Sequence, residues 1–153
     1  MKKIVILTIF YLVFIITYTY TEVLKENKPF VEFELEKYRG GKEKLSSLFN
    51  INDTDNIIIL NFFSKTCEPC KKELTVLNKL SSDFKNDAVI IRLINIDKEG
   101  VEEYLKENKT ELTILLDPEA LRTGKKYKIL DDYDRANLPK TIILDKNKNI
   151  RYI

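Results

Sequence analysis

The sequence has no histidine and no tryptophan, and only 2 of its 153 residues are cysteine. The absence of histidine excludes Ser-His-Asp and Cys-His catalytic triads, histidine metal sites and histidine-ligated haem in this chain. Two cysteines cannot provide the four ligands of a structural zinc ion, so we expect no metal site built by this chain alone. Glycine and proline are scarce, with 4 of each, which excludes collagen-like and linker-like chains.

The remaining composition is that of one globular domain, with 44% hydrophobic and 33% charged residues. The net charge of +2 has a local origin. Without Lys2 and Lys3, the 26 basic residues fall to 24 and equal the 24 acidic residues. A neutral domain lacks the basic surface of a nucleic-acid-binding protein, so we expect no nucleic-acid partner.

One long run of uncharged residues lies at the N-terminus, over residues 4–21. Its length is close to the minimum for a membrane-spanning helix, and the two lysines before it favour a cytoplasmic N-terminus. We therefore expect a signal anchor at 1–21, a linker at 22–28 and a single domain at 29–153 outside the cytoplasm. A cleaved signal peptide is the alternative, although no small-residue cleavage site follows the run. Both interpretations place the domain in an oxidising compartment, where paired cysteines form disulfides.

The rest of the chain alternates strand and helix patterns. Alternating or continuous apolar segments predict strands at 30–35, 57–63, 88–96, 112–116, 141–145 and 150–153. Apolar residues at helical spacing predict helices at 69–84 and 100–108, and a further helical stretch after Asp117 in which Tyr127, Leu130 and Tyr133 are three apart. Turns are expected at 39–41 and 146–149. This order indicates an α/β sandwich around a central mixed sheet.

A pair of cysteines carries the chemistry. Cys67 and Cys70 lie between a predicted buried strand and the first turn of a helix, where residues three apart are neighbours and can form a disulfide. The partial positive charge and unpaired amides of a helix N-terminus lower the pKa of the first thiol, which makes Cys67 the expected attacking sulfur. Cys70 is then the resolving thiol. Pro69 suits the first helical turn, because that position needs no amide donor.

Two less specific interpretations of the pair are a structural disulfide and two unrelated thiols. A four-residue ring stabilises a fold by only about 2 kcal/mol on the loop-entropy model, compared with about 3 kcal/mol for a fifteen-residue loop. Covalent haem attachment needs histidine after the second cysteine, and Lys71 is there. Redox chemistry with Cys67–Cys70 as the reactive disulfide is the interpretation we prefer.

The stretch Asn61-Phe-Phe-Ser-Lys-Thr-Cys-Glu-Pro-Cys-Lys-Lys-Glu-Leu74 resembles the active site of the thioredoxin superfamily, in its ResA/TlpA-like branch. The segment 133–145 is similar to the part of that family around its cis-proline. The resemblance implies a thioredoxin-like fold with an N-terminal hairpin, and a bacterial, membrane-anchored thiol-disulfide oxidoreductase. It also implies a protein disulfide as substrate, apocytochrome c in several members of the family, and a membrane protein as electron donor.

The resemblance assigns roles to further residues. Pro139 would be the cis-proline that faces the cysteines, and Leu138 would offer backbone groups to an extended substrate; a trans proline opening a strand is the alternative. Glu73 would lie beneath the active site and influence the protonation of Cys70, unless it is a solvated residue of the first helical turn. Glu68 and Pro69 would border the substrate, and the charge of Glu68 would partly oppose the effect of the helix dipole on Cys67.

Three features depart from the family pattern. Thr66 and Phe63 stand where tryptophans are common, and Lys140 replaces a threonine. The sequence also stops at Ile153, before the usual C-terminal helix. We therefore expect one face of the sheet to expose several isoleucine and leucine side chains, and residues 22–153 alone to be marginally stable, oligomeric or aggregation-prone.

The sequence thus leads to one preferred function and two alternatives. The preferred function is an extracytoplasmic reductase of protein disulfides, of the kind used in cytochrome c maturation, recharged by a membrane electron donor. A disulfide oxidase or isomerase would use the same residues at another redox potential. A catalytically weak, tethered module that binds peptides along 138–140 is the third possibility.

Overall fold

The structure is a computed structural model that describes residues 28–49, 56–85, 88–131 and 135–153. The expected signal anchor at 1–21 and nearly all of the linker lie outside these ranges. Within them, every helix is too short or too polar to cross a lipid bilayer.

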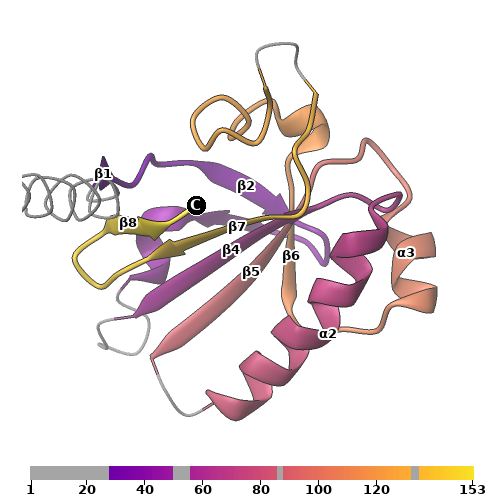
Figure 1. Cartoon of the computed structure of the whole chain (residues 1–153), viewed down its shortest axis with the longest axis horizontal. Coiled ribbons are helices and arrows are strands. Elements are labelled where there is room, and N and C mark those ends of the chain that lie inside the picture. The colour runs from indigo at the N-terminus through magenta and orange to yellow at the C-terminus, as the bar shows by residue number, and fades with distance from the viewer. Residues whose placement is uncertain (1–27, 50–55, 86–87, 132–134) are drawn as a thin grey trace, which may run out of the picture.

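One mixed sheet organises the domain, with eight strands in the order β1-β8-β7-β4-β5-β6-β2-β3 (Figure 1). Strands β4, β5 and β6 are parallel, and every other neighbouring pair is antiparallel. The strands are β1 (Lys28–Pro29), β2 (Glu34–Lys37), β3 (Lys42–Lys44), β4 (Ile57–Phe63), β5 (Val89–Asn95), β6 (Thr113–Leu116), β7 (Lys140–Leu144) and β8 (Asn149–Tyr152). The helices are η1 (Leu45–Leu48), α2 (Glu68–Asp83), α3 (Val101–Glu107) and η3 (Pro118–Ala120). The predicted mixed sheet is confirmed.

The N-terminal hairpin joins β2 to β3 through the predicted turn. Gly40 and Gly41 have φ angles of 95° and 81°, in a region that L side chains rarely adopt. The turn at the other end of the sheet is also present, because the Asp145 amide donates to the Asn149 carbonyl across the β7–β8 connection.

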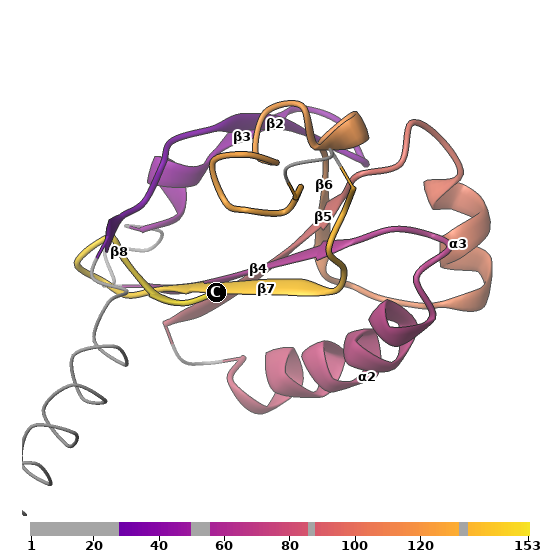
Figure 2. The same cartoon turned by 45° about the horizontal axis from the view of Figure 1, so that its top comes forward.

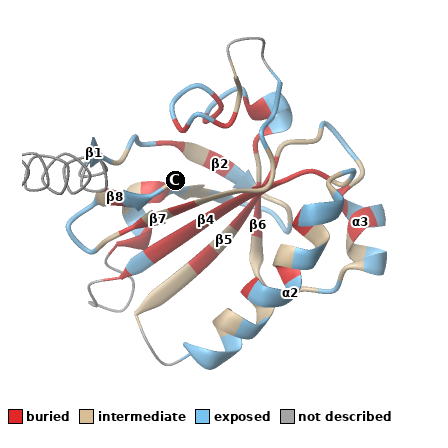
Figure 3. Cartoon of the chain, viewed as in Figure 1, coloured by how far each residue is buried: buried red, intermediate tan, exposed pale blue. Residues whose placement is uncertain are grey.

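Strand β4 lies in the middle of the sheet and is buried along nearly its whole length (Figure 3). Ile58 and Phe62 belong to one core, while Ile59 and Phe63 belong to a second core on the opposite face. This alternation follows from the two-residue period of a strand, and explains why a continuous apolar run is needed here.

Different elements cover the two faces. Helices α2 and α3 pack on one face, with Leu74, Leu77, Val101 and Tyr104 in the core between them and the sheet. The sheet curls so that β2, β3 and η1 lie over the other face (Figure 2). There Leu45, Leu48 and Phe49 meet Tyr127 and Ile129 from the segment after η3.

The expected exposure of several isoleucine and leucine side chains is wrong for the described residues. Ile57, at 42%, is the only isoleucine or leucine of the described strands that counts as exposed. The reason is that the curled hairpin side of the sheet and the segment 118–131 cover the face opposite α2. The structural argument for a marginally stable domain is correspondingly removed.

The predicted strand at 30–35 is also partly wrong, because only residues 34 and 35 of this segment are in a strand. Between β1 and β2 the chain is held by a side chain. The Val31 amide donates to the Tyr127 hydroxyl at 3.1 Å, and this hydroxyl donates to the Val31 carbonyl at 2.6 Å. Phe33 and Leu35 are nevertheless buried, as the alternation predicts.

The helical stretch predicted after Asp117 is present only as the single turn η3. The carboxylate of Asp117 accepts hydrogen bonds from the amides of Arg122 and Thr123, which favours a compact loop over a continuing helix. Glu119 and Lys128 have positive φ angles of 57° and 54°, which no regular helix contains. Tyr133 lies outside the described residues.

Candidate active site

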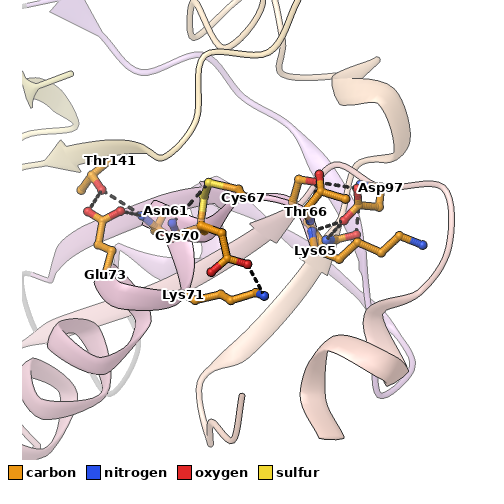
Figure 4. The surroundings of a disulfide bond; sticks show 12 residues. Asn61, Lys65, Thr66, Cys67, Cys70, Lys71, Glu73, Asp97 and Thr141 are labelled. Atoms are coloured by element: carbon orange, nitrogen blue, oxygen red, sulfur yellow. Dashed lines mark hydrogen bonds and ion pairs between the residues drawn. A yellow bond between two sulfur atoms is a disulfide. The ribbon is translucent and has the colours of Figure 1, made fainter. Parts of the chain in front are cut away.

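Cys67 and Cys70 form a disulfide at the N-terminus of α2, as the sequence predicts (Figure 4). Strand β4 ends at Phe63, the loop 64–66 and the N-cap residue Cys67 follow, and α2 begins at Glu68. Phe63 is buried and its ring lies 5.0 Å from that of Tyr104, so the end of the strand is fixed in the core under α3. Pro69 lies in the first turn of the helix, as expected.

The two sulfurs differ in environment. Cys70 is only 2% exposed, whereas Cys67 is partly exposed. Cys67 is the N-cap of α2, and its Sγ accepts a hydrogen bond from the Cys70 amide at 3.2 Å. An N-cap acceptor next to unpaired helix amides is stabilised as an anion. The geometry therefore favours a thiolate on Cys67 and keeps Cys70 behind it.

Glu68 is exposed at the start of α2, and its charge is paired. Its carboxylate lies 2.6 Å from the Lys71 ammonium group. This hydrogen bond raises the pKa of Lys71, so the lysine remains protonated beside it. The pairing reduces the expected opposition between Glu68 and the helix dipole.

Glu73 lies on the side of α2 that faces the sheet, and its carboxylate is held from two strands. Oε2 accepts from Asn61 Nδ2 of β4 at 2.9 Å, and Oε1 accepts from Thr141 Oγ1 of β7 at 2.8 Å. Asn61 Nδ2 also donates to Thr141 Oγ1 at 2.9 Å. The alternative of a freely solvated Glu73 is therefore wrong. Its influence on Cys70 stays a prediction.

The loop before β7 faces the disulfide from another part of the chain. The peptide bond between Leu138 and Pro139 is cis, as the resemblance implies. Leu138 lines a groove of about 500 Å³ together with Cys67, Glu68, Pro69, Ile96 and Ala136. Four of the predicted site residues thus line one groove, and two more are next to it, Cys70 through the disulfide and Pro139 through the cis peptide bond. Glu73 lies apart from the groove, under the helix.

A second polar group lies on the other side of the disulfide from Glu73 (Figure 4). The Asp97 carboxylate accepts from Ser64 Oγ at 2.7 Å and from the Lys65 amide at 2.6 Å. Asn95 Nδ2 also donates to it, at 2.9 Å. Asp97 thus connects the end of β5 to the loop that leads into Cys67.

Sequence reasoning missed Asn61, Thr141 and Asp97. A signal existed for Asp97, because a polar residue two positions after the end of a strand parallel to β4 lies at the same edge of the sheet as the cysteines. Asn61 is a polar residue within an otherwise apolar buried run, which also marks it. Across the described ranges, no three carboxylate or thiol side chains are grouped to hold a metal ion.

Comparison with known proteins shows the family to which the chain belongs. A family model described as the AhpC/TSA family matches residues 27–153. The thiol-disulfide oxidoreductase ResA of Bacillus subtilis is 29% identical over 126 residues, which is 81% of this chain and 64% of the relative. A thiol-disulfide oxidoreductase structure from Bacteroides fragilis is 25% identical with a TM-score of 0.66, covering 80% of this chain and 87% of that one.

The fold has its own support. The thioredoxin domain of a thiol-disulfide oxidoreductase from Bacteroides vulgatus superposes with a TM-score of 0.65 at 18% identity, over 83% of this chain and 86% of that one. The expected thioredoxin-like fold is therefore confirmed. The chain spans about 64% of the length of the first curated relatives that it matches.

Proposed function

Because the chain belongs to the thioredoxin-like AhpC/TSA family, we propose that it is a thiol-disulfide oxidoreductase that reduces protein disulfides. One observation carries the proposal: an accessible Cys67 at the N-cap of α2 is paired with a buried Cys70 beside a groove. The similar proteins from Bacillus subtilis and Bacteroides fragilis are named thiol-disulfide oxidoreductases, which supports thiol-disulfide exchange as the chemistry.

The first step forms a mixed disulfide. In the reduced protein, the Cys67 thiolate attacks one sulfur of a substrate disulfide in the groove. A bond forms between Cys67 Sγ and this sulfur, the substrate S–S bond breaks, and the second substrate sulfur leaves as a thiolate that takes a proton from water. The Cys70 amide, which donates to Cys67 Sγ, stabilises the attacking anion.

The second step releases the reduced substrate. Cys70, as thiolate, attacks Cys67 Sγ, so the Cys67–Cys70 disulfide forms and the remaining substrate sulfur leaves with its electron pair. Two electrons pass from the cysteine pair to the substrate. A dithiol donor must then reduce the disulfide, which agrees with the expected membrane electron-donor protein.

The proposed setting follows from the N-terminal sequence. Residues 4–21 would anchor the protein in a bacterial cell membrane by a single pass, with the domain outside the cytoplasm. Apocytochrome c before haem attachment is the substrate that the resemblance suggests. Its paired cysteines must be reduced before haem can be bound covalently.

The reduction potential of the Cys67–Cys70 pair tests the direction of the reaction. We expect a value at or below about −250 mV, measured by equilibration of the full chain in detergent with redox buffers. A value near −120 mV, as in strong periplasmic oxidants, would contradict the reductase function. Reduction of a model protein disulfide by the prereduced chain, lost in Cys67→Ala, tests the activity itself.

A further inference from the structure

We infer that Asp97 is a positioning residue for Cys67, because it holds the loop 64–66 so that the Cys67 sulfur stays at the N-cap of α2 when the disulfide is open. The inference rests on the proposed redox function and adds to it a residue outside the CxxC motif. Asp97 belongs neither to the groove lining nor to the group around Glu73.

The carboxylate of Asp97 connects to each residue of the loop, directly or through one hydroxyl. It accepts from the Ser64 hydroxyl and from the Lys65 amide at 2.7 and 2.6 Å. Ser64 Oγ in turn accepts from the Thr66 amide at 3.4 Å and lies 3.2 Å from Thr66 Oγ1. The Cys67 amide donates to the Ser64 carbonyl at 3.1 Å, so the last residue of this chain of contacts is the cysteine itself.

Asp97 is itself held in place. Asn95 is fully buried at the end of β5, donates to the Asp97 carboxylate through Nδ2 and accepts from the Asp97 amide through Oδ1. The next residue of the chain, Ile96, donates its amide to the Phe63 carbonyl at 3.1 Å. The Asp97 carboxylate is therefore held at a fixed position at the end of β5, and its hydrogen bonds hold the loop 64–66 at that position.

The hydrogen bonds between Asp97 and the loop 64–66 matter most in the reduced state. In the oxidised protein the covalent bond to the buried Cys70 holds Cys67 at the start of α2. Reduction removes that bond. The amides of Cys70 and Lys71 still donate to the Cys67 carbonyl, at 3.1 and 3.4 Å, and the loop keeps the residue on its other side in place. If the loop relaxes, the thiolate loses its N-cap hydrogen bond and the pKa of Cys67 rises toward that of an ordinary cysteine.

The direction in which the Cys67 pKa changes distinguishes a positioning role of Asp97 from a direct effect of its charge. Loss of the loop contacts raises the Cys67 pKa, whereas removal of a nearby negative charge lowers it. Asp97→Ala removes both the contacts and the charge. Asp97→Asn removes only the charge, because the amide oxygen can accept from Lys65 and Asn95 while Nδ2 donates to the Ser64 hydroxyl.

The test is the pH dependence of Cys67 alkylation by iodoacetamide, in full-length protein carrying Cys70→Ala, which leaves the amide at position 70 in place. We expect Asp97→Ala to slow alkylation at pH 7 by about 3- to 10-fold through a higher Cys67 pKa. Asp97→Asn should not slow alkylation, because it keeps the loop contacts, and loss of the charge moves the Cys67 pKa only downward. Both variants leave unchanged the charged residues that flank the cysteines and the cis-proline among those the structure describes: Lys65, Glu68, Lys71, Glu73 and Lys140.

Asp145→Ala is the matched control. Asp145 Oδ1 also accepts two backbone amides, of Asn147 and Asn149 at 2.9 Å each, but it braces the β7–β8 turn. This variant should lose stability and leave the alkylation profile unchanged. If Asp97→Ala does not fold, Ser64→Ala takes its place and should raise the Cys67 pKa in the same direction, by a smaller amount.

An unchanged profile in Asp97→Ala, or in Ser64→Ala where that variant replaces it, would overturn the inference, as would a lower Cys67 pKa in both Asp97 variants. If the parent protein still has a Cys67 pKa below that of an ordinary cysteine, both of these results leave the proposed redox function intact. An ordinary cysteine pKa in the parent, together with no reduction of a protein disulfide, would instead overturn the proposed function and this inference with it.

Discussion

Replacement of Glu73 by glutamine is the sharpest test of coupling between the cysteine pair and the charge beneath α2. Glu73 follows Cys70 by three residues in one helix, so the two side chains are neighbours, roughly 6 Å apart. At that distance two unit charges interact by about 0.7 kcal/mol in water and about 2.8 kcal/mol at an effective dielectric constant of 20. Removing the Glu73 charge should therefore lower the pKa of Cys70 by about 0.5 to 2 units.

The effect should be uneven between the two thiols. Cys67 is six residues from Glu73 and lies beyond Cys70 at the helix end, so its pKa should fall less. The substitution also replaces one acceptor oxygen by an amide group, which must face either Asn61 or Thr141. One hydrogen bond to a charged group is weakened, and we expect a stability loss of about 1 to 2 kcal/mol.

Thiolate absorbance near 240 nm gives both titration curves, with Cys67→Ala reporting Cys70 and Cys70→Ala reporting Cys67. Asp83→Asn is the control, because Asp83 is an acidic residue of the same helix at its far end, paired with Lys79. An unchanged Cys70 titration in Glu73→Gln would refute the coupling, and an equal shift in Asp83→Asn would show that the effect is not local.

Three further predictions concern Cys67 and Tyr127. Cys67 should be the sulfur alkylated in the reduced protein and trapped in mixed disulfides when Cys70 is replaced by alanine, because Cys70 is only 2% exposed; equally efficient trapping through Cys70 in Cys67→Ala would refute the assignment. Tyr127→Phe removes both hydrogen bonds to Val31 and should lower the free energy of unfolding by about 1 to 3 kcal/mol in urea titrations. Burial raises the pKa of Tyr127 from 10.0 to about 12, so the wild-type protein should lose stability as pH rises from 10.0 toward 12, a loss that Tyr127→Phe should not show.

The sequence alone determined the local elements and the redox centre. The apolar run of β4 and the helical spacing of Leu74, Leu77 and Leu80 predict the two elements that place the cysteines, and both are observed. These features could be predicted because each depends on residues adjacent in the chain, whose side-chain period follows from the backbone geometry. The cysteine pair needed nothing more than its spacing and its place at a helix start.

Only the tertiary structure decided what surrounds the sulfurs. Thr141 reaches Glu73 across 68 residues because β7 pairs antiparallel with β4, and Asp97 reaches Ser64 across 33 residues because β5 pairs parallel with β4. Strand order of this kind leaves no trace in the local pattern. The same limit explains the false helix near Tyr127, because this residue is buried in a loop and not on the apolar face of a helix.

Long-range contacts also determine which segment covers the face of the sheet opposite α2. The segment 118–131 packs on the curled sheet because the Tyr127 ring is part of the core on that face. The Tyr127 hydroxyl also donates a hydrogen bond to the carbonyl of Val31, 96 residues away in the chain. The sequence showed an aromatic residue but not the surface that it would cover. Burial of a loop depends on which distant apolar groups the topology brings beneath it, and that is a property of the assembled fold.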